Sequence, residues 1–272
     1  MDFNHRSREY FSSLSVSKEL PGSYYKSLEY SFFSGGKRVR PLFLELIGSI
    51  WGLNSKKLFP AALAVELIHT YSLIHDDLPS MDDDTYRRGK VTHHVKYGEA
   101  SAVLAGDSFL TLAFQVLAEN YSGDKLKKLV VELSSCSGLH GMVGGQVLDC
   151  LTQKRSKNIF NKIHHLKTAK LFEYSCVAPG IIADLNNKDL GHLRSLGKNL
   201  GLLFQLQDDL FDEDKKDERL EENILSIVSR EELIEMIKEK EKNIKESLGN
   251  LSGFSDNKKL TEFLEKVFRR TH

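Results

Sequence analysis

The strongest constraint on this chain is an apolar stretch that runs directly into a dense group of charges. Residues 56–78 are apolar almost all round, and a helix that is hydrophobic on every face is buried in a core. Acidic side chains packed closely at helical spacing repel one another. The charges at and beyond the end of this stretch are Asp76, Asp77, Asp82, Asp83, Asp84, Arg87, Arg88 and Lys90.

This mixture of acids and bases has a chemical meaning. Hard divalent cations bind carboxylate oxygens, and the arginine guanidinium binds phosphate oxygens. The pattern therefore predicts a central helix that ends at a metal–phosphate site. A lone acidic run is also typical of a solvated loop, and that alternative stays open for this cluster taken alone.

A second acidic cluster ends another apolar run, over residues 204–212. Asp208 and Asp212 are four residues apart and share one helix face, with Asp209 beside them. Two such clusters, each ending an apolar helix, could lie opposite each other across one cavity. The pair favours a metal site over two solvated loops.

The overall composition suits a helical globular protein. The chain has 272 residues, of which 40% are hydrophobic and only 5 are proline, enough for one large domain or two small ones. Lys plus Arg and Asp plus Glu balance at 38 each, so no global charge favours nucleic acid. We expect helices over 23–33, 42–52, 56–78, from about 98 onward, and over 124–149, 157–185, 188–212, 229–248 and 256–270, after a polar arm or short helix in 1–23.

The cysteines and the N-terminus indicate a compartment. Cys136, Cys150 and Cys176 are odd in number and lack the spacing of metal ligands, which fits a reducing environment. No apolar run of a signal peptide follows Met1, and no stretch reaches the roughly 18 apolar residues of a membrane span. We therefore expect a soluble, cytoplasmic protein without stable membrane insertion.

A basic glycine turn precedes the long apolar stretch. Segment 34–41 reads Ser-Gly-Gly-Lys-Arg-Val-Arg-Pro, in which Pro41 suits the first turn of a helix. Free backbone N–H groups at a helix start and three nearby cations form an anion site. Basic turns are common, so this segment alone is weak evidence.

Together these segments resemble the trans-polyprenyl diphosphate synthases. Asp76-Asp77-x4-Asp82 with Arg87-Arg88-Gly-Lys90 resembles their first aspartate-rich motif, and Asp208-Asp209-x-x-Asp212 resembles the second. The likeness runs from about Tyr25 to about Asp212 and is closest to the bacterial farnesyl-forming members. It implies one all-α domain over 1–272, a helical bundle of the isoprenoid synthase type around a deep central cavity, usually as a homodimer.

The resemblance also implies roles for individual residues. Mg²⁺, as three ions with substrate bound, would be held by Asp76, Asp77, Asp82, Asp208 and Asp212. The catalytic set would be Asp76, Asp77, Asp82, Arg87, Lys167, Asp208 and Asp209. Isopentenyl diphosphate would contact Lys37, Arg40, His69 and Arg88, and the allylic diphosphate would contact Arg87, Lys167, Thr168 and Gln205.

Tyr71 is a candidate for setting product length. It lies five residues before Asp76, which is about 7.5 Å deeper along a helix at 1.5 Å per residue. A bulky ring there would block a growing hydrocarbon tail and resembles the farnesyl-forming members. An ordinary core tyrosine is the alternative.

The implied reaction is head-to-tail condensation of isopentenyl diphosphate with dimethylallyl or geranyl diphosphate to farnesyl diphosphate. Geranyl or geranylgeranyl diphosphate is the alternative product. A class I terpene cyclase is a less favoured alternative, because it would need no second diphosphate site. A non-catalytic subunit that binds prenyl diphosphates is another, and only one departure from the family pattern favours it. After Asp212 the usual Gly-Lys is missing and the charged segment 213–223 is shortened, so Lys215 or Lys216 either replaces that lysine or belongs to a solvated loop.

Overall fold

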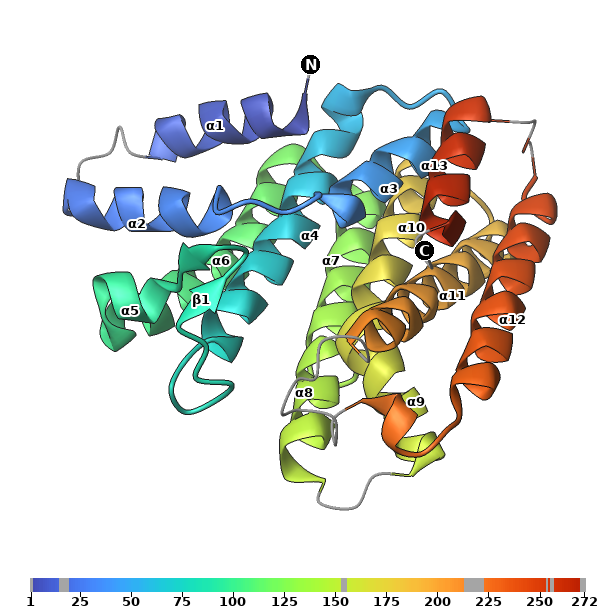
Figure 1. Ribbon diagram of the computed structural model, residues 1–272. Coiled ribbons are helices and arrows are strands. Elements are labelled where there is room, and N and C mark those ends of the chain that lie inside the picture. The colour runs from blue at the N-terminus through green and yellow to red at the C-terminus, as the bar shows by residue number, and fades with distance from the viewer. Residues whose placement is uncertain are drawn as a thin grey trace. The chain divides into compact units, whose positions relative to one another are not determined.

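The computed structural model describes residues 2–14, 20–152, 156–212, 223–252, 254 and 257–269. Their regular structure is helical apart from one short hairpin, which confirms the all-α prediction (Figure 1). The chain folds as two compact units, Met1–Leu42 with Ser55–Leu126, and Phe43–Asn54 with Lys127–His272. They are called unit 1 and unit 2 below.

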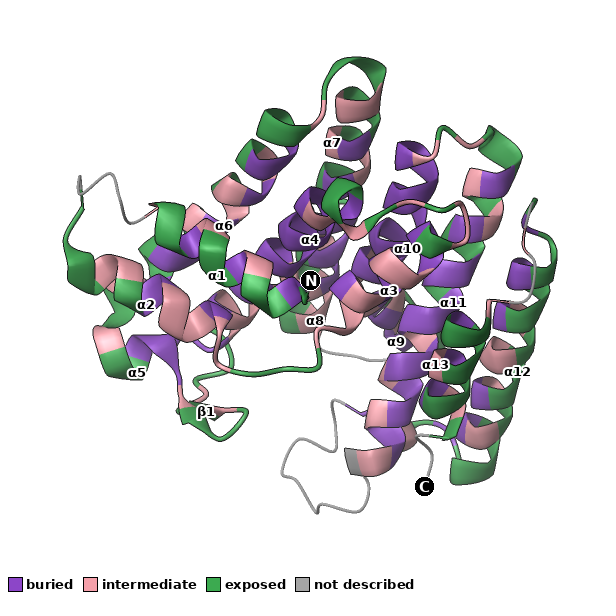
Figure 2. Ribbon diagram, turned by 90° about the horizontal axis from the view of Figure 1, so that it is seen from above, coloured by how far each residue is buried: buried purple, intermediate pink, exposed green. Residues whose placement is uncertain are grey.

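Unit 1 is built around a pair of long helices, α4 and α6, which lie side by side. Ala61 to Ile68 of α4 are buried without interruption, as the all-round apolar pattern predicts (Figure 2). The elements of this unit are α1 (Phe3–Leu14), α2 (Gly22–Phe32), α4 (Ser55–Asp76), β1 (Tyr86–Arg87), β2 (Lys90–Val91), α5 (His93–Tyr97) and α6 (Glu99–Asn120). Residues 1–23 therefore contain a helix rather than an extended arm.

Two helices of unit 1 have the length and mean hydropathy of a membrane span. They are α4 and α6, with 72% and 39% of their most apolar windows buried. The sequence was expected to hold no stretch of this kind, so that expectation was too strict. A buried core helix meets the same criterion, and α4 is buried throughout Ala61–Ile68.

Unit 2 is centred on α10, in which Leu171 to Ile182 are all buried (Figure 2). It packs against α11, which also packs against α12. Helix α3 (Val39–Ser49) begins in unit 1 and continues into unit 2, and α7 (Gly123–Ser137) does the same. The other elements are α8 (Met142–Leu151), α9 (Lys157–Ile163), the π-helical turn η2 (His164–Ala169), α10 (Lys170–Ile182), α11 (Asn187–Asp212), the 3₁₀ turn η5 (Ile224–Ser226), α12 (Arg230–Gly249) and α13 (Lys258–Phe268).

Two expected helices of unit 2 differ from the prediction. The single helix expected over 124–149 is two helices, because the chain turns tightly at Gly138–Gly141 and a Cβ on Gly141 would lie 2.0 Å from the carbonyl oxygen of Cys136. The helix expected over 157–185 ends at Ile182 and contains η2. Both errors concern backbone geometry that side-chain periodicity does not report.

Candidate active site

The first acidic cluster lies where α4 ends and the chain folds back on itself. The amide of Asp82 donates to the carbonyl of Asp76 at 2.9 Å, and Asp83 adopts a left-handed φ of 52° that sharpens the turn. The backbones of Asp76 and Asp82 are thereby brought together. They lie at the C-terminal, negative end of a 22-residue helix dipole, where further acids are unfavourable without a cation.

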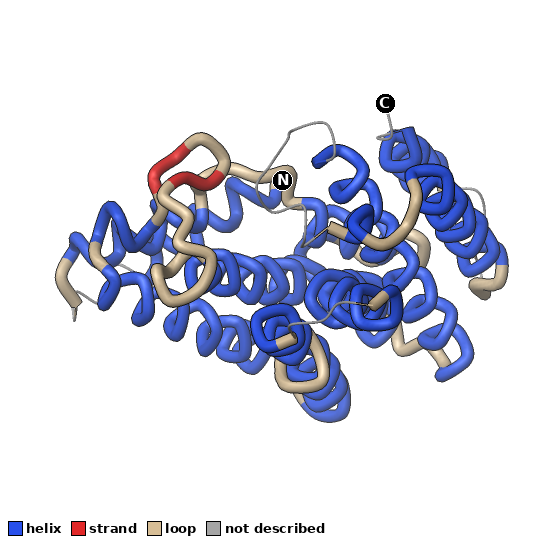
Figure 3. Tube along the Cα trace, turned by 60° about the horizontal axis from the view of Figure 1, so that its bottom comes forward, coloured by secondary structure: helices blue, strands red, loops and turns tan. Residues whose placement is uncertain are grey.

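The hairpin that follows presents the two arginines. Strands β1 and β2 pair Tyr86 with Val91 and Arg87 with Lys90, and are drawn in red in Figure 3. Both residues of the connecting turn have positive φ, 54° at Arg88 and 73° at Gly89. Two such residues form the type I′ turn that suits the twist of a two-residue hairpin.

Arg87 is held by two acids of the same cluster. Its Nε donates to Asp77 Oδ1 at 2.5 Å, and its Nη2 donates to Asp84 Oδ2 at 3.1 Å. Burial raises the pKa of Asp77, and the Arg87 guanidinium opposes that rise without cancelling it. Asp77 is only 4% exposed, so its carboxylate positions Arg87 rather than facing solvent.

Arg88 lies against the basic glycine turn predicted from segment 34–41. Its Nη1 donates to the carbonyl of Gly35 at 2.6 Å. A Cβ on Gly36 would lie 2.4 Å from that nitrogen, and Gly36 has φ of 111°. Glycine suits this position, because φ of 111° is strained for a residue with a side chain and a Cβ would displace the Arg88 guanidinium.

His69 lies in a strongly positive environment. Its pKa is lowered well below the usual value, first by burial and then by the charges of Arg40, Arg88, Arg38 and Arg87. The structure thus brings Arg40, His69, Arg87 and Arg88 into one region, as predicted, while Lys37 is exposed on the turn. Such a concentration of guanidinium groups is suited to a polyanion.

Arg38 has a structural role within this region. It donates to Glu66 Oε1 at 2.5 Å and to the carbonyl of Phe32, and its guanidinium lies 4.7 Å from the centre of the Phe32 ring. Glu66 is 3% exposed, so this is a buried ion pair that anchors the glycine turn to α4.

Two rings fill the last turns of α4. Tyr71 is 6% exposed, and burial and then the charge of Asp76 raise its pKa to about 12. Its ring packs edge-on against His75, whose Nε2 is 3.1 Å from the carbonyl oxygen of Val103. A Cβ on Gly106 would lie 2.0 Å from the same nitrogen, so α6 needs glycine there to admit the histidine.

A small open pocket lies in unit 1. Its walls include Asp77, Arg87, Arg88 and Lys90. Two of the residues predicted to bind diphosphate, Arg87 and Arg88, therefore line the same pocket as an aspartate of the first cluster. Lys90 received no role from the sequence pattern.

In unit 2, the predicted Lys167 and Thr168 lie on the π-helical turn η2. Lys167 Nζ donates to Asp149 Oδ2 at 2.6 Å. π-Helical turns are rare in proteins, and those that occur are often found at functional sites. Asp149 was missed, because a partner eighteen residues away on another helix leaves no local signal.

A chain of polar contacts joins η2 to α11. Thr168 Oγ1 donates to Gln205 Oε1 at 2.8 Å, and Gln205 Nε2 donates to Asp209 Oδ1 at 3.0 Å. The other oxygen of Asp209 is 3.5 Å from His164 Nε2. The structure thus brings together Thr168, Gln205 and Asp209, all predicted, and adds His164.

The second acidic cluster occupies the last turns of α11. Asp208 is half-buried, whereas Asp209 is only 5% exposed. Asp212 is the final residue of the helix, and its side chain lies outside the described residues, as do Lys215 and Lys216. In both clusters the first aspartate of the pair is more accessible than the second, because neighbours on a helix point about 100° apart.

The donors present fit magnesium. Mg²⁺ is bound through one or two carboxylates and keeps its other positions for water and substrate phosphates. In unit 1, Asp76 and Asp82 offer two carboxylates at the end of α4, and in unit 2 Asp208 is half-buried in the last turns of α11. Among the described residues no three acidic, histidine or cysteine side chains converge as a ready-made metal centre.

Residues 21–266 match the family model described as polyprenyl synthetase. The chain belongs to the polyprenyl synthetase family. It is 44% identical over 208 residues to the farnesyl diphosphate synthase of Bacillus subtilis (strain 168), covering 74% of this chain and 70% of that protein.

Solved structures of the family agree over nearly the whole chain. A geranyltransferase from Legionella pneumophila has a TM-score of 0.86 and 32% identity, covering 99% of this chain and 95% of that one. A geranyltransferase from Helicobacter pylori complexed with magnesium and isoprenyl diphosphate has a TM-score of 0.80 and 27% identity, covering 98% and 97%. The family resemblance inferred from the motifs is thereby confirmed.

Proposed function

We propose that this protein is a Mg²⁺-dependent prenyltransferase that condenses isopentenyl diphosphate with dimethylallyl or geranyl diphosphate to give farnesyl diphosphate. The observation that carries the proposal is the arginine-rich region around His69, built beside an acidic helix end. Cations concentrated next to carboxylates suit a diphosphate that is bound both directly and through a metal. Membership of the polyprenyl synthetase family supports the same reaction.

The aspartates divide into two roles under this proposal. Asp76, Asp82 and Asp208 would hold Mg²⁺, with Asp77 and Asp212 in support, and three ions are expected with substrate bound. When bound, Mg²⁺ would neutralise the negative charge that develops on the departing diphosphate. Asp77 and Asp209 would also orient Arg87 and Gln205, since each is buried and bonded to that neighbour.

The basic and polar side chains would hold the two diphosphates. Lys37, Arg40, His69 and Arg88 bind isopentenyl diphosphate, whose nucleophilic carbons must be held against the allylic cation. The allylic diphosphate is bound by Arg87, Lys167, Thr168 and Gln205, which supply fixed charge and donors where negative charge develops.

Lys167 must change partner during this cycle. In the structure its ammonium is paired with Asp149, and binding of the allylic diphosphate would replace that carboxylate with a phosphate oxygen. The isopentenyl double bond is the nucleophile, and the released diphosphate is the base that takes the last proton, so the mechanism needs neither a protein nucleophile nor a protein base.

Tyr71 would limit the product to fifteen carbons. Its buried ring lies close enough to Asp76 for that charge to raise its pKa, which supports a position below the metal-binding end of α4. We expect Tyr71→Ala to lengthen the product, whereas Tyr71→Phe should leave it unchanged because the ring is kept.

We also propose a soluble, cytoplasmic homodimer. The neighbouring residues Val103 and Leu104 of α6 are 43% and 56% exposed. Large exposed apolar side chains at such positions are typical of an association surface. Light scattering on the purified protein would give the mass of two chains, and a monomer would contradict this part of the proposal.

A product assay tests the reaction. Labelled isopentenyl diphosphate is supplied with dimethylallyl, geranyl or farnesyl diphosphate, with and without Mg²⁺, and chain length is read by chromatography. We expect a Mg²⁺-dependent C15 product. A C20 product would keep the chemistry and remove Tyr71 as the length limit, and no condensation by folded protein would overturn the proposal in favour of a cyclase or a binding subunit.

A further inference from the structure

The π-helical turn η2 carries Lys167 and Thr168, the side chains proposed to bind the allylic diphosphate. Glycines of two other helices pack against its widened backbone. A Cβ on Gly145 of α8 would lie 2.2 Å from the backbone nitrogen of Lys167. A Cβ on Gly201 of α11 would lie 2.3 Å from the Cα of Ala169. Two helix backbones therefore press directly against the turn.

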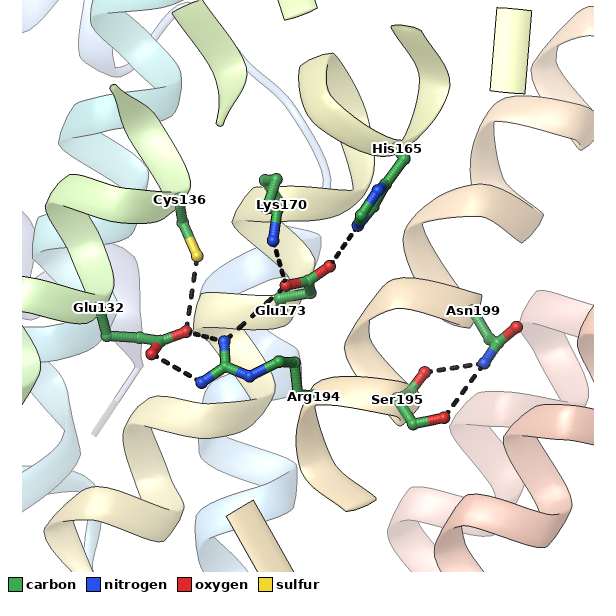
Figure 4. A network of polar contacts seen from close by, with 8 residues as sticks. All are labelled: Glu132, Cys136, His165, Lys170, Glu173, Arg194, Ser195 and Asn199. Carbon is green, nitrogen blue, oxygen red and sulfur yellow. Dashed lines mark hydrogen bonds and ion pairs between the residues drawn. The ribbon is translucent and has the colours of Figure 1, made fainter. Parts of the chain in front are cut away.

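A side-chain network spans the same turn (Figure 4). His165 Nε2 lies 2.7 Å from Glu173 Oε1, and Lys170 Nζ donates to Glu173 Oε2 at 2.8 Å. Lys167 and Thr168 lie in the sequence between these two partners of Glu173. The contacts of Glu173 thus link the two sides of the short segment that contains Lys167 and Thr168.

The contact between His165 and Glu173 depends on the π turn. In a regular α-helix, residues eight apart differ by about 80° around the axis, since each residue turns the chain by about 100°. A π turn absorbs one residue, so His165 and Glu173 are related as residues seven apart and fall within about 20° of one face. The N–H of Lys170 bonds to the carbonyl of His165, which is the five-residue spacing of such a turn.

Glu173 is buried among the surrounding helices. It is 1% exposed, and Arg194 of α11 lies 3.8 Å away, beyond hydrogen-bond distance. The hydrogen bonds of Arg194 go instead to both carboxylate oxygens of Glu132 on α7. Burial raises the pKa of Glu173, but hydrogen bonds from His165 and Lys170 outweigh it and leave the pKa below its usual value.

We infer that Glu173 is a positioning residue that locks η2 in its π form and so aims Lys167 and Thr168 at the allylic diphosphate. This inference rests on the proposed function. Without the carboxylate, His165 loses its partner and the turn can relax toward regular helix. Lys167 and Thr168 then rotate by about 100° relative to α10 and away from Asp149 and Gln205.

The contacts of Glu173 with His165 and Lys170 are called the clamp below. The test uses two variants that weaken this clamp and one matched control. His165→Leu removes the contact between His165 and Glu173, at a side chain that is 27% exposed. Glu173→Gln keeps the shape of the Glu173 side chain but removes its negative charge. Glu132→Gln is the control, because it alters another largely buried carboxylate of the network that does not contact η2. Steady-state kinetics and amide hydrogen exchange over residues 160–175 are measured for all three.

We expect His165→Leu and Glu173→Gln to raise KM for geranyl diphosphate about tenfold, to leave KM for isopentenyl diphosphate within about twofold, and to speed amide exchange in η2. Glu132→Gln should change neither KM. Unchanged KM values in both clamp variants, or the same pattern in the control, would overturn the inference.

Failure of the proposed function would be seen separately, as a wild-type protein that makes no prenyl product. In that case, exchange in η2 decides the locking role. Faster exchange in His165→Leu but not in Glu132→Gln supports the clamp, and equal exchange in wild type and His165→Leu refutes it.

Discussion

The two regions that are proposed to bind the diphosphates are built in opposite ways. In unit 1, Arg88 and the glycine turn owe their positions to irregular backbone, with positive φ at Gly35, Gly36, Arg88 and Gly89. In unit 2, Lys167 and Thr168 lie inside a helix whose register is altered by one residue. The first region gathers positive charge around His69, whereas the second pairs its charged groups internally.

This difference indicates two ways of preparing a diphosphate site. A region with excess positive charge attracts its anion over a distance and gains most when the anion arrives. A region whose lysine is already paired offers less attraction but holds its donors in fixed directions before binding. Under the proposed function, the first would favour capture of a substrate, and the second would favour stabilisation of a leaving group.

The largest effects should follow loss of the accessible aspartate in either region. Asp76→Ala and Asp208→Ala should each lower kcat by about a hundredfold to a thousandfold, because each removes a carboxylate proposed to hold the metal that offsets the developing charge. Circular dichroism should show an unchanged fold. A near-normal rate from either variant would remove that residue from the metal assignment.

Substitution of one glycine in each region should affect the KM of a different substrate. Gly36→Ala should raise KM for isopentenyl diphosphate about tenfold, because a side chain there is strained at φ of 111° and displaces Arg88. Gly145→Ala should instead raise KM for geranyl diphosphate, because its Cβ collides with the backbone of Lys167. Both are read from initial rates with the second substrate saturating. If each variant affected both substrates equally, the division between the regions would be lost.

Acid should weaken unit 1 before unit 2. Burial and then the charge of His94 lower the pKa of His93 to about 4, so the folded chain does not take up the proton that the unfolded chain accepts below about 6.5. Stability is therefore lost as the pH falls from about 6.5 to about 4. Glu173 has a lowered pKa, so its contribution is present above the unfolded value of 4.5 and is lost only below it.

Urea unfolding between pH 7.5 and pH 5 measures this difference. Trp51 is the only tryptophan and belongs to unit 2, so its fluorescence reports that unit while circular dichroism reports both. We expect the midpoint to fall with pH in the wild type and to fall less in His93→Gln. The same slope in both proteins would show that His93 does not carry the effect.

The smallest effect is expected where a glycine of α11 contacts nothing. Gly191 has no atom within 4 Å of its would-be Cβ, in contrast to Gly201 on the same helix. Gly191→Ala should stabilise the protein by about 0.5–1 kcal/mol through higher helix propensity. Gly201→Ala should destabilise it, and thermal unfolding of the pair tests whether contact, rather than glycine itself, matters.

Sequence analysis predicted much of unit 1 because its signals are local. The apolar helix, the acidic end, the paired arginines and the glycine turn each occupy a short continuous segment, although the hairpin that carries the arginines was not predicted. The pattern alone did not show which aspartate of each adjacent pair is buried. Asp77 and Asp209 turn inward beside accessible neighbours, because successive residues on a helix face different sides.

Less of unit 2 could be predicted. Periodicity merged α7 and α8 into one helix and did not detect η2, since one extra residue in a turn changes the pattern very little. Asp149, His164 and Glu173 received no role, because their partners come from other helices or from two turns away. The roles of Lys167 and Thr168 came from the family resemblance rather than from their own pattern.

The π turn also limits how the length of this chain can vary. Surface loops usually tolerate gain or loss of residues, whereas removal of one residue from His164–Ala169 would restore an ordinary helix. Every side chain on the N-terminal side would then swing to a different neighbour, although the composition of the segment would hardly change. In this short stretch the number of residues itself sets which neighbours the side chains meet, and a deletion there should be more damaging than most substitutions.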